Sequence, residues 1–351
     1  MLVDVVETPE EAAALEVPPL VVRQNLAAAI PGAGPLEVER LGEGHSNITF
    51  LVTRGADRWV LRRPPRPPLP PTAHDVLREY RVLSALAGAE VRTPKPVMAC
   101  KDVEVIGAPF YLMELVEGAV VRHALPAELD NPAERRRIAE ELVDALVELH
   151  AVDWRACGLE DFGKPTGYVE RQVRRWTGQW EQNRTRELSA IEQVGGWLAA
   201  NVPDSPAATI VHGDYKLDNV ILAPGAPARV AAIFDWEMAT IGDPLADVGY
   251  MAATYVERDD PNEGLLGISR TTRAEGFPSR AELIARYEAR SGRSMGNLPW
   301  YQALALWKLA ILLEGSYKRL LAGTTDDPFF ELLDEGVPLL AEQALAVTRT
   351  L

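Results

Sequence analysis

The stretch that decides the fold is His212-Gly213-Asp214-Tyr215-Lys216-Leu217-Asp218-Asn219. Sixteen residues beyond Asn219 a second polar cluster begins, Asp235-Trp236-Glu237. Each cluster directly follows a short run of β-favouring apolar residues, at 209–211 and 229–234. Either cluster alone would be typical of a turn, because Gly, Asp and Asn favour turns. Two such clusters, each at the end of an apolar strand and within reach of a hairpin, indicate a functional site.

The residue types in the two clusters meet the needs of phosphoryl transfer. A carboxylate must orient the attacking hydroxyl and accept its proton, an amide oxygen and a second carboxylate must hold Mg²⁺, and a cation must balance the charge on the transferred group. In that order the candidates are Asp214, Asn219, Asp235 and Lys216. The spacing also reproduces the kinase catalytic loop, H-R-D-x-x-x-x-N, with glycine in place of arginine.

With these motifs the chain resembles the aminoglycoside phosphotransferase family, which comprises small-molecule kinases with the protein-kinase-like fold. The resemblance extends over nearly the whole chain and includes the later motif Gly242-Asp243-Pro244-Leu245-Ala246-Asp247. It implies that Asp214 is the catalytic base and that Asn219 and Asp235 bind magnesium. It further implies that the Gly-Asp-Pro segment, with Asp247, supports the catalytic loop from behind.

The rest of the chain fits an α+β, bilobal protein-kinase-like fold. We expect a nucleotide-binding lobe over residues 1–113 and a helical lobe with the catalytic loop and acceptor site over 114–351. The first lobe should hold a small antiparallel sheet and one helix, after a leading helix at 18–30. Its predicted strands are 36–41, 48–52, 58–61, 103–106 and 110–113. Helices are predicted over 133–150, 168–183, 188–200, 281–290 and 301–321.

Two features of the first lobe are candidates for binding ATP phosphates. Gly44 and Ser46 belong to a Gly-x-Gly loop between two predicted strands, where backbone N–H groups could cover phosphates, although a tight turn explains the same pattern. Next, the strand that carries the phosphate-binding lysine in kinases ends here in Arg62-Arg63. A guanidinium suits phosphate geometry, so Arg62 is the candidate, with Glu79 as its partner, and Arg63 is left open.

The resemblance also places a hinge at residues 110–118. It implies that the adenine edge meets the backbone of Glu114 and Val116. As for the acceptor, the Gly-Asp-Pro motif follows Asp235 within eight residues and no Ala-Pro-Glu motif comes after it. The activation segment on which protein kinases dock a peptide is therefore missing, and a small-molecule hydroxyl is the expected acceptor.

Basic residues on two predicted helices bear on which acceptor that is. At 100° per residue, Arg171, Arg174 and Arg175 share one helix face, and Lys308 and Arg319, eleven residues apart, share a stripe of another helix. These cations form either a solvated surface or an anion-binding wall. The two segments resemble the kinase-like module fused to some acyl-CoA dehydrogenases, whose implied acceptors are hydroxylated acyl thioesters. Cationic aminoglycosides would instead need carboxylates, so both acceptor classes, and other metabolites, stay open.

Composition bears on the partners and the cellular location of the protein. The 351 residues include 36 basic and 51 acidic ones, a net charge of −15 that would repel nucleic acid. Only Cys100 and Cys157 are present, the N-terminus is acidic, and the most apolar stretch, 298–313, is interrupted by polar residues. We therefore expect a cytoplasmic protein without a membrane span. The competing function is a nucleotide-binding pseudokinase or regulatory module, and neither the oligomeric state nor a preference for ATP over GTP follows from the sequence.

Overall fold

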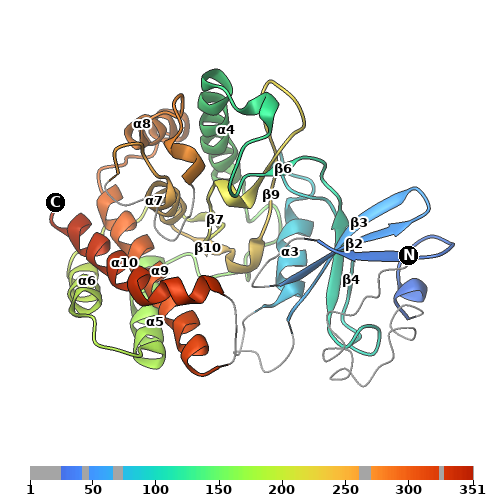
Figure 1. The fold of residues 1–351 in the computed structure, drawn as a ribbon, viewed down its shortest axis with the longest axis horizontal. Coiled ribbons are helices and arrows are strands. Elements are labelled where there is room, and N and C mark those ends of the chain that lie inside the picture. Colours follow the sequence, from blue (N-terminus) through green and yellow to red (C-terminus); the bar gives the residue numbers. More distant parts are fainter. Residues whose placement is uncertain (1–24, 42–46, 66–73, 261–269, 324–327, 351) are drawn as a thin grey trace. The chain divides into compact units, whose positions relative to one another are not determined.

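The computed structural model describes residues 25–41, 47–65, 74–260, 270–323 and 328–350 (Figure 1). Contacts divide the chain into two compact units. The first comprises Met1–Glu117 together with the short segment Phe234–Glu237, and the second comprises Gly118–Ile233 and Met238–Leu351. The segment Phe234–Glu237, which includes the second polar cluster of the sequence, therefore belongs to the first unit, although the strand that leads into it belongs to the second.

The first unit contains one antiparallel sheet with strand order β1-β2-β3-β5-β4 and the helix α3, Val76–Leu86. Strand β2, which lies between β1 and β3, alternates buried and half-buried residues, the period of a strand with one face in the core. The strands are β1 (Glu37–Arg40), β2 (Ile48–Arg54), β3 (Asp57–Arg63), β4 (Pro96–Cys100) and β5 (Phe110–Glu114). The predicted α+β, protein-kinase-like fold with a small antiparallel sheet is confirmed.

One strand of that sheet was predicted in the wrong place. Residues 103–106 are a turn, and the edge strand is instead Pro96–Cys100. Turn chemistry overrides the apolar alternation here, because the Asp102 carboxylate accepts the Glu104 N–H at 3.0 Å and Gly107 N–H donates to the Val103 carbonyl at 2.7 Å. Pro96 is tolerated because it stands at the first position of an edge strand.

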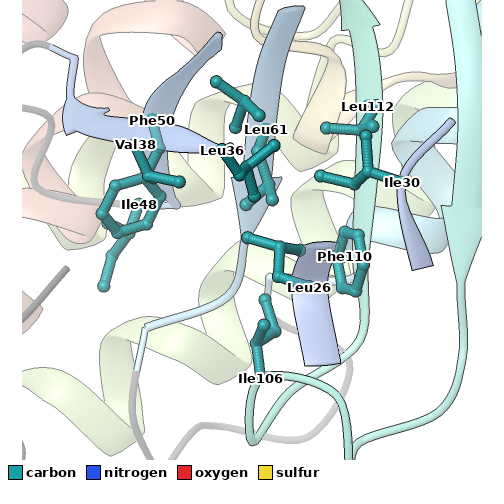
Figure 2. Close-up of a cluster of buried hydrophobic side chains, with 11 residues drawn as sticks. Leu26, Ile30, Leu36, Val38, Ile48, Phe50, Leu61, Ile106, Phe110 and Leu112 are labelled. Carbon is teal, nitrogen blue, oxygen red and sulfur yellow. The ribbon is translucent and has the colours of Figure 1, made fainter. Parts of the chain in front are cut away.

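A hydrophobic cluster packs one part of this unit (Figure 2). Leu26 and Ile30, from the end of the predicted leading helix, pack with Phe110 and Leu112 of β5. Arg54 closes the same helix end, since its guanidinium donates to the Ile30 carbonyl at 2.8 Å and to the Ala27 carbonyl at 2.6 Å. A cation that binds the last carbonyls of a helix satisfies acceptors that have no partner within the helix.

The second unit is mainly helical (Figure 1). The helices are α4 (Pro132–Ala151), α5 (Tyr168–Asn183), α6 (Ser189–Ala200), α7 (Leu245–Thr254), α8 (Arg280–Ser291), α9 (Leu298–Leu321) and α10 (Leu333–Thr348). The five predicted helices are confirmed as α4, α5, α6, α8 and α9, whereas α7 and α10 were missed. Pro338 lies inside α10, and a proline in the interior of a helix argues against that helix in the sequence.

Two small sheets carry the motif loops. Strand β7 (Thr209–Val211) pairs with β10 (Thr240–Gly242), and β8 (Val220–Leu222) lies between β6 (Ala119–Val120) and β9 (Val230–Ile233). The first polar cluster therefore begins where β7 ends, and the second begins after β9, as predicted. In the part of the chain that the structure describes, no helix combines the length and apolarity that crossing a membrane requires.

Candidate active site

The loop after β7 is held in place by a carboxylate from α7. Asp247 is fully buried and accepts the backbone N–H groups of His212 and Gly213, each at 2.7 Å. It also contacts His150 Nε2 at 3.2 Å. Burial opposes its charge, but the contact with His150 and the N–H of Gly213 outweigh it and lower the pKa of Asp247. Asp247 thus holds the loop after β7 in place, and the family resemblance implied a supporting contact of this kind.

Glycine at position 213 has a steric cause. Its φ is +87°, and a Cβ there would lie 2.8 Å from the Met238 carbonyl oxygen. Residues with a side chain rarely adopt this conformation, and backbone blocks the space that the side chain would need. The arginine of the protein-kinase loop therefore has no room in this chain.

Three of the predicted site residues meet at the Asp214 carboxylate. Asn219 Nδ2 donates to Asp214 Oδ2 at 2.7 Å and to the Asp214 carbonyl at 2.8 Å. Lys216 Nζ lies 3.5 Å from the same carboxylate oxygen. Tyr250, which sequence analysis missed, is buried on α7 beside them, and burial followed by the charge of Asp214 raises the pKa of its phenol. The Asp214 side chain itself is 22% exposed, so an acceptor can reach it.

The first unit holds a second polar group of residues around Arg62. Arg62 Nη2 lies 2.9 Å from Asp235 Oδ1, and its Nε lies 3.3 Å from Glu79 Oε2. Burial opposes the guanidinium charge, but Glu79 and Asp235 outweigh it and raise the pKa of Arg62. Arg63 instead donates from its Nε to the Pro64 carbonyl at 3.2 Å. The predicted partners Arg62 and Glu79 are therefore brought together.

Glu79 is completely buried and is fixed by two further donors that sequence analysis missed. Tyr111 donates its hydroxyl at 2.8 Å and Asn47 donates from Nδ2 at 2.6 Å. Burial nevertheless raises the pKa of Glu79, since it outweighs the opposing effect of Arg62. Tyr111 pairs in register with Arg62 across β3 and β5, a relationship that an alignment of the two strands could have found.

Three acidic side chains of the first unit form a candidate cation site. Glu79, Asp235 and Glu237 each offer one carboxylate oxygen, and these oxygens lie within 4.8 Å of one another. Mg²⁺ prefers oxygen ligands of this kind, so the residues fit that ion. Because Glu79 is already engaged by Arg62, Tyr111 and Asn47, the better candidates are Asp235 and Glu237. Glu237 stands in the quoted cluster but was not among the predicted ligands.

The backbone of Asp235 is unusual. Its φ is +68°, in the left-handed region that non-glycine residues rarely adopt. Such strain persists only where surrounding structure imposes it, and it concentrates at functional sites. Asn219, the other predicted metal ligand, belongs to the second unit, where its amide is bonded to Asp214.

The structure describes two of the four remaining residues that were predicted to bind the nucleotide. Glu114 ends β5, where its N–H donates to the Lys95 carbonyl at 2.9 Å and its carboxylate accepts the Lys95 N–H at 3.0 Å. Val116 follows it and is half-buried. Gly44 and Ser46 lie outside the described residues.

Of the five predicted acceptor cations, two come together. The Lys308 Nζ lies 5.4 Å from the centroid of the Trp176 ring, and the Arg175 Cζ lies 5.8 Å from the same ring. Arg174 is exposed on the same helix, α5. The other two are held elsewhere: Arg171 donates to the carbonyls of Lys164 and Thr166, and Arg319 lies by Ser316 and Phe330.

Comparisons with known proteins assign the chain to a family. The phosphotransferase enzyme family APH matches residues 37–292. Acyl-CoA dehydrogenase family member 11 of Gallus gallus is 36% identical over 341 residues, which cover 94% of this chain and 43% of that protein. The chain thus spans less than half the length of this curated relative. The resemblance to the kinase-like module of acyl-CoA dehydrogenases is confirmed.

Solved structures extend the comparison. An aminoglycoside phosphotransferase candidate from Ralstonia eutropha JMP134 is 34% identical, with a TM-score of 0.78, covering 93% of this chain and 98% of that one. A thermostable mutant of aminoglycoside phosphotransferase APH(4)-Ia, in complex with AMP-PNP and hygromycin B, shares the fold at 15% identity, with a TM-score of 0.62 and coverage of 93% and 98%. APH(2″)-IIIa, in complex with GDP and kanamycin, does so at 20% identity, with a TM-score of 0.61 and coverage of 92% and 97%. The chain therefore belongs to the APH phosphotransferase enzyme family.

Proposed function

We propose that the chain is an ATP- and Mg²⁺-dependent phosphotransferase that transfers the γ-phosphoryl group to a hydroxyl of a small molecule. The observation that carries this proposal is the Asp214 carboxylate, which is partly exposed, contacted by Asn219 and Lys216, and placed on a loop that Asp247 fixes. A fixed carboxylate beside a cation and an amide is the arrangement that phosphoryl transfer to an alcohol requires.

In the proposed reaction Asp214 orients the acceptor hydroxyl and takes its proton. The acceptor oxygen forms a bond to the γ-phosphorus as the bond between that phosphorus and the β,γ-bridging oxygen breaks, and ADP leaves with the electron pair. Lys216, 3.5 Å from Asp214, would balance negative charge on the group in transfer. The mechanism needs no covalent enzyme intermediate, so positioning and electrostatics supply the catalysis.

Residues of the first unit would bind the nucleotide. Arg62 would contact phosphate oxygens, because its guanidinium is held by two carboxylates and its fork suits phosphate. Since the Glu114 N–H is bonded to Lys95, Glu114 would offer adenine its carbonyl, with Val116 as the second backbone contact. Gly44 and Ser46 would cover the phosphates. APH(4)-Ia with AMP-PNP supports ATP, whereas APH(2″)-IIIa with GDP keeps GTP in the test.

Asp235 and Asn219 would hold Mg²⁺, with Glu237 as a further ligand. When bound, the ion neutralises charge on the nucleotide phosphates. A catalytically inactive nucleotide-binding module is the competing function, and the intact contact between Asp214 and Asn219 argues against it. Two free cysteines support the proposed cytoplasmic location.

The test is consumption of Mg·ATP and Mg·GTP by the purified chain. The acceptor panel pairs aminoglycosides with hydroxyacyl-CoA thioesters, the latter because the chain resembles part of an acyl-CoA dehydrogenase family member. Asp214→Asn serves as the blank. Acceptor-dependent turnover that this variant lacks would support the proposal, and nucleotide binding without turnover of any acceptor would favour the inactive module.

A further inference from the structure

A buried lysine of the second unit has no ion-pair partner among the residues that the structure describes. Lys308 lies in the middle of α9 and is 9% exposed. Its neighbours one turn away on the same helix are apolar, among them Leu304 and Ile311. Lysine is almost never buried unless its charge is paired, because removing an ammonium group from water is costly.

The described residues supply only an aromatic contact. The Lys308 Nζ lies 5.4 Å from the centroid of the Trp176 ring, a cation–π distance. No carboxylate that the structure describes lies within ion-pair distance of it. Burial lowers the pKa of Lys308 to about 8, against the opposing charges of Asp247 and Asp214 and with a smaller contribution from Arg175. The lysine therefore keeps most of its charge at neutral pH, and none of the described carboxylates forms an ion pair with it.

The two acidic groups that act on Lys308 are committed elsewhere. Asp247 accepts the two loop N–H groups and contacts His150, and Asp214 is bonded to Asn219 and contacted by Lys216. They offset part of the cost of the buried charge but do not pair with it. Lys308 belongs to the same unit as Asp214, and the charge of Asp214 acts on it.

A second cation shares the same ring. Arg175 of α5 is exposed, and its Cζ lies 5.8 Å from the Trp176 centroid. Like Lys308, Arg175 has no ion-pair partner among the residues that the structure describes. Helix α5 packs against α9, so the two elements bring two unpaired cations to one aromatic side chain. Their mutual repulsion would be relieved by an anion that both contact.

We propose that Lys308 and Arg175, at the Trp176 ring, bind an anionic oxygen group of the acceptor, a carboxylate or a phosphate, while its hydroxyl lies at Asp214. This inference rests on the proposed phosphotransferase function and names the acceptor class. All four residues belong to the second unit, whereas the phosphate-binding candidate Arg62 belongs to the first. Such a site would disfavour polycationic aminoglycosides, since the two cations Lys308 and Arg175 would repel their amino groups.

The kinetic test compares acceptors that differ only in the anionic group. Hydroxy acids are paired with their methyl esters, which tests a carboxylate, and hydroxyacyl-CoA thioesters are paired with the same acyl groups on N-acetylcysteamine, which tests the phosphates. Lys308→Met should raise the KM of the anionic acceptor about tenfold or more, the effect of one lost charge-assisted hydrogen bond, and leave the KM for ATP unchanged. Arg175→Gln, at an exposed position, should shift the same constant less.

The matched control is Lys318→Met, which removes an exposed lysine from the same helix. Equal KM values in Lys308→Met and wild type for the anionic acceptors would overturn the proposal, as would a preference for the neutral partner of each pair or for aminoglycosides. If wild type turns over no acceptor, the phosphotransferase function fails instead. The anion site is then tested separately by thermal unfolding. Acetate or inorganic phosphate should raise the Tm of wild type and of Lys318→Met, and the absence of that rise in these two proteins would refute the anion site.

Discussion

The Asn219 amide donates two hydrogen bonds to Asp214, one to the Asp214 carboxylate at 2.7 Å and one to the Asp214 backbone carbonyl at 2.8 Å. Asn219 stands five positions after Asp214, and the turn of 3₁₀-helix at Leu217–Asn219 brings the Asn219 side chain back over Asp214. Because the carboxylate is held from its own loop, its orientation does not depend on a bound ligand. Removing its charge should therefore affect chemistry without disturbing the fold.

We accordingly expect Asp214→Asn to lower kcat by about 10²–10⁴-fold, the usual contribution of a general base. The amide has the same shape as the carboxylate, and the loop is anchored by Asp247 at other atoms, so the far-ultraviolet circular dichroism and the Tm should match wild type. Steady-state kinetics with the best acceptor measures the effect. A variant that keeps more than a tenth of the wild-type kcat would remove Asp214 from the mechanism.

A second prediction concerns the stability of the loop. Asp247→Asn keeps one oxygen acceptor for the two backbone N–H groups that the carboxylate now binds, so one buried donor would face an NH₂ group. The expected loss is about 2–4 kcal/mol in the free energy of unfolding. Urea titration measures it, with Asp204→Asn, an exposed position, as the control that should stay within about 0.5 kcal/mol.

The same substitution has a pH signature. Since the folded-state pKa of Asp247 is lowered, the carboxylate contributes stability above its unfolded pKa, and this contribution is lost as the pH falls through the folded pKa. Wild type should therefore lose stability faster than Asp247→Asn on acidification below about pH 4. Parallel loss in both proteins would show that the charge of Asp247 does not stabilise the loop.

Much of this site could be predicted because its signals are local. The contact of Asp214 with Asn219 follows from their spacing in one loop, and the helix 168–183 was predicted with both ends correct because its apolar period is strong. The predicted strand at 103–106 was wrong although its signal is also local. Its alternation is local, but the turn formed by Asp102 and Gly107 decides the backbone.

Pairings between distant segments could not be predicted from the sequence. Tyr111 reaches Glu79 only because β3 and β5 align it with Arg62, and Lys308 meets Trp176 only through the packing of α9 on α5. Arg171 illustrates the converse. Helical geometry groups it with Arg175, but its long side chain turns back to the carbonyls that precede the helix.

The ion pairs of Arg62 predict that its charge stabilises the fold, whereas the geometry of its guanidinium group contributes to ATP binding. Arg62→Met leaves Glu79 buried without its cation and should destabilise the chain by about 3–5 kcal/mol. Arg62→Lys keeps the charge but cannot bridge Glu79 and Asp235 in the same way, so it should fold and raise the KM for ATP. Arg58→Met, an exposed pair with Glu117, is the control and should cost at most about 1 kcal/mol. Similar stability of Arg62→Met and wild type would contradict this account.

Glu237 should contribute to magnesium binding if the cluster with Asp235 is the ion site. Glu237→Gln keeps the shape of the side chain and removes one anionic ligand, so the Mg²⁺ concentration for half-maximal activity should rise about tenfold. Glu237→Asp should have an intermediate effect. The measurement is ATP turnover against free Mg²⁺, with exposed Glu117→Gln as the control. An unchanged Mg²⁺ dependence would mean that Glu237 does not bind the ion and serves only its contacts with Asn47 and His74.

Lys308 should trade stability for binding. Its pKa falls from 10.5 to about 8 on folding, so the protonated lysine favours the unfolded chain, and the penalty is complete below pH 8. The charged groups that act on it are Asp247 of α7, Asp214 of the catalytic loop and Arg175 of α5. Lys308→Met removes the penalty and should stabilise the chain by about 3 kcal/mol at pH 7.

The sign of its pH dependence provides a check on that difference. As the pH rises from 8 to 10.5, wild type should lose the buried charge and recover stability, so its deficit relative to Lys308→Met should shrink. Urea titrations of both proteins at pH 7 and pH 10 measure the change, and Lys318→Met, which removes an exposed lysine, should show none. A constant difference between the two pH values would mean that Lys308 titrates as in water. If Lys308→Met is more stable than wild type and also binds the anionic acceptor more weakly, Lys308 is a residue retained for binding at a cost to the stability of the fold.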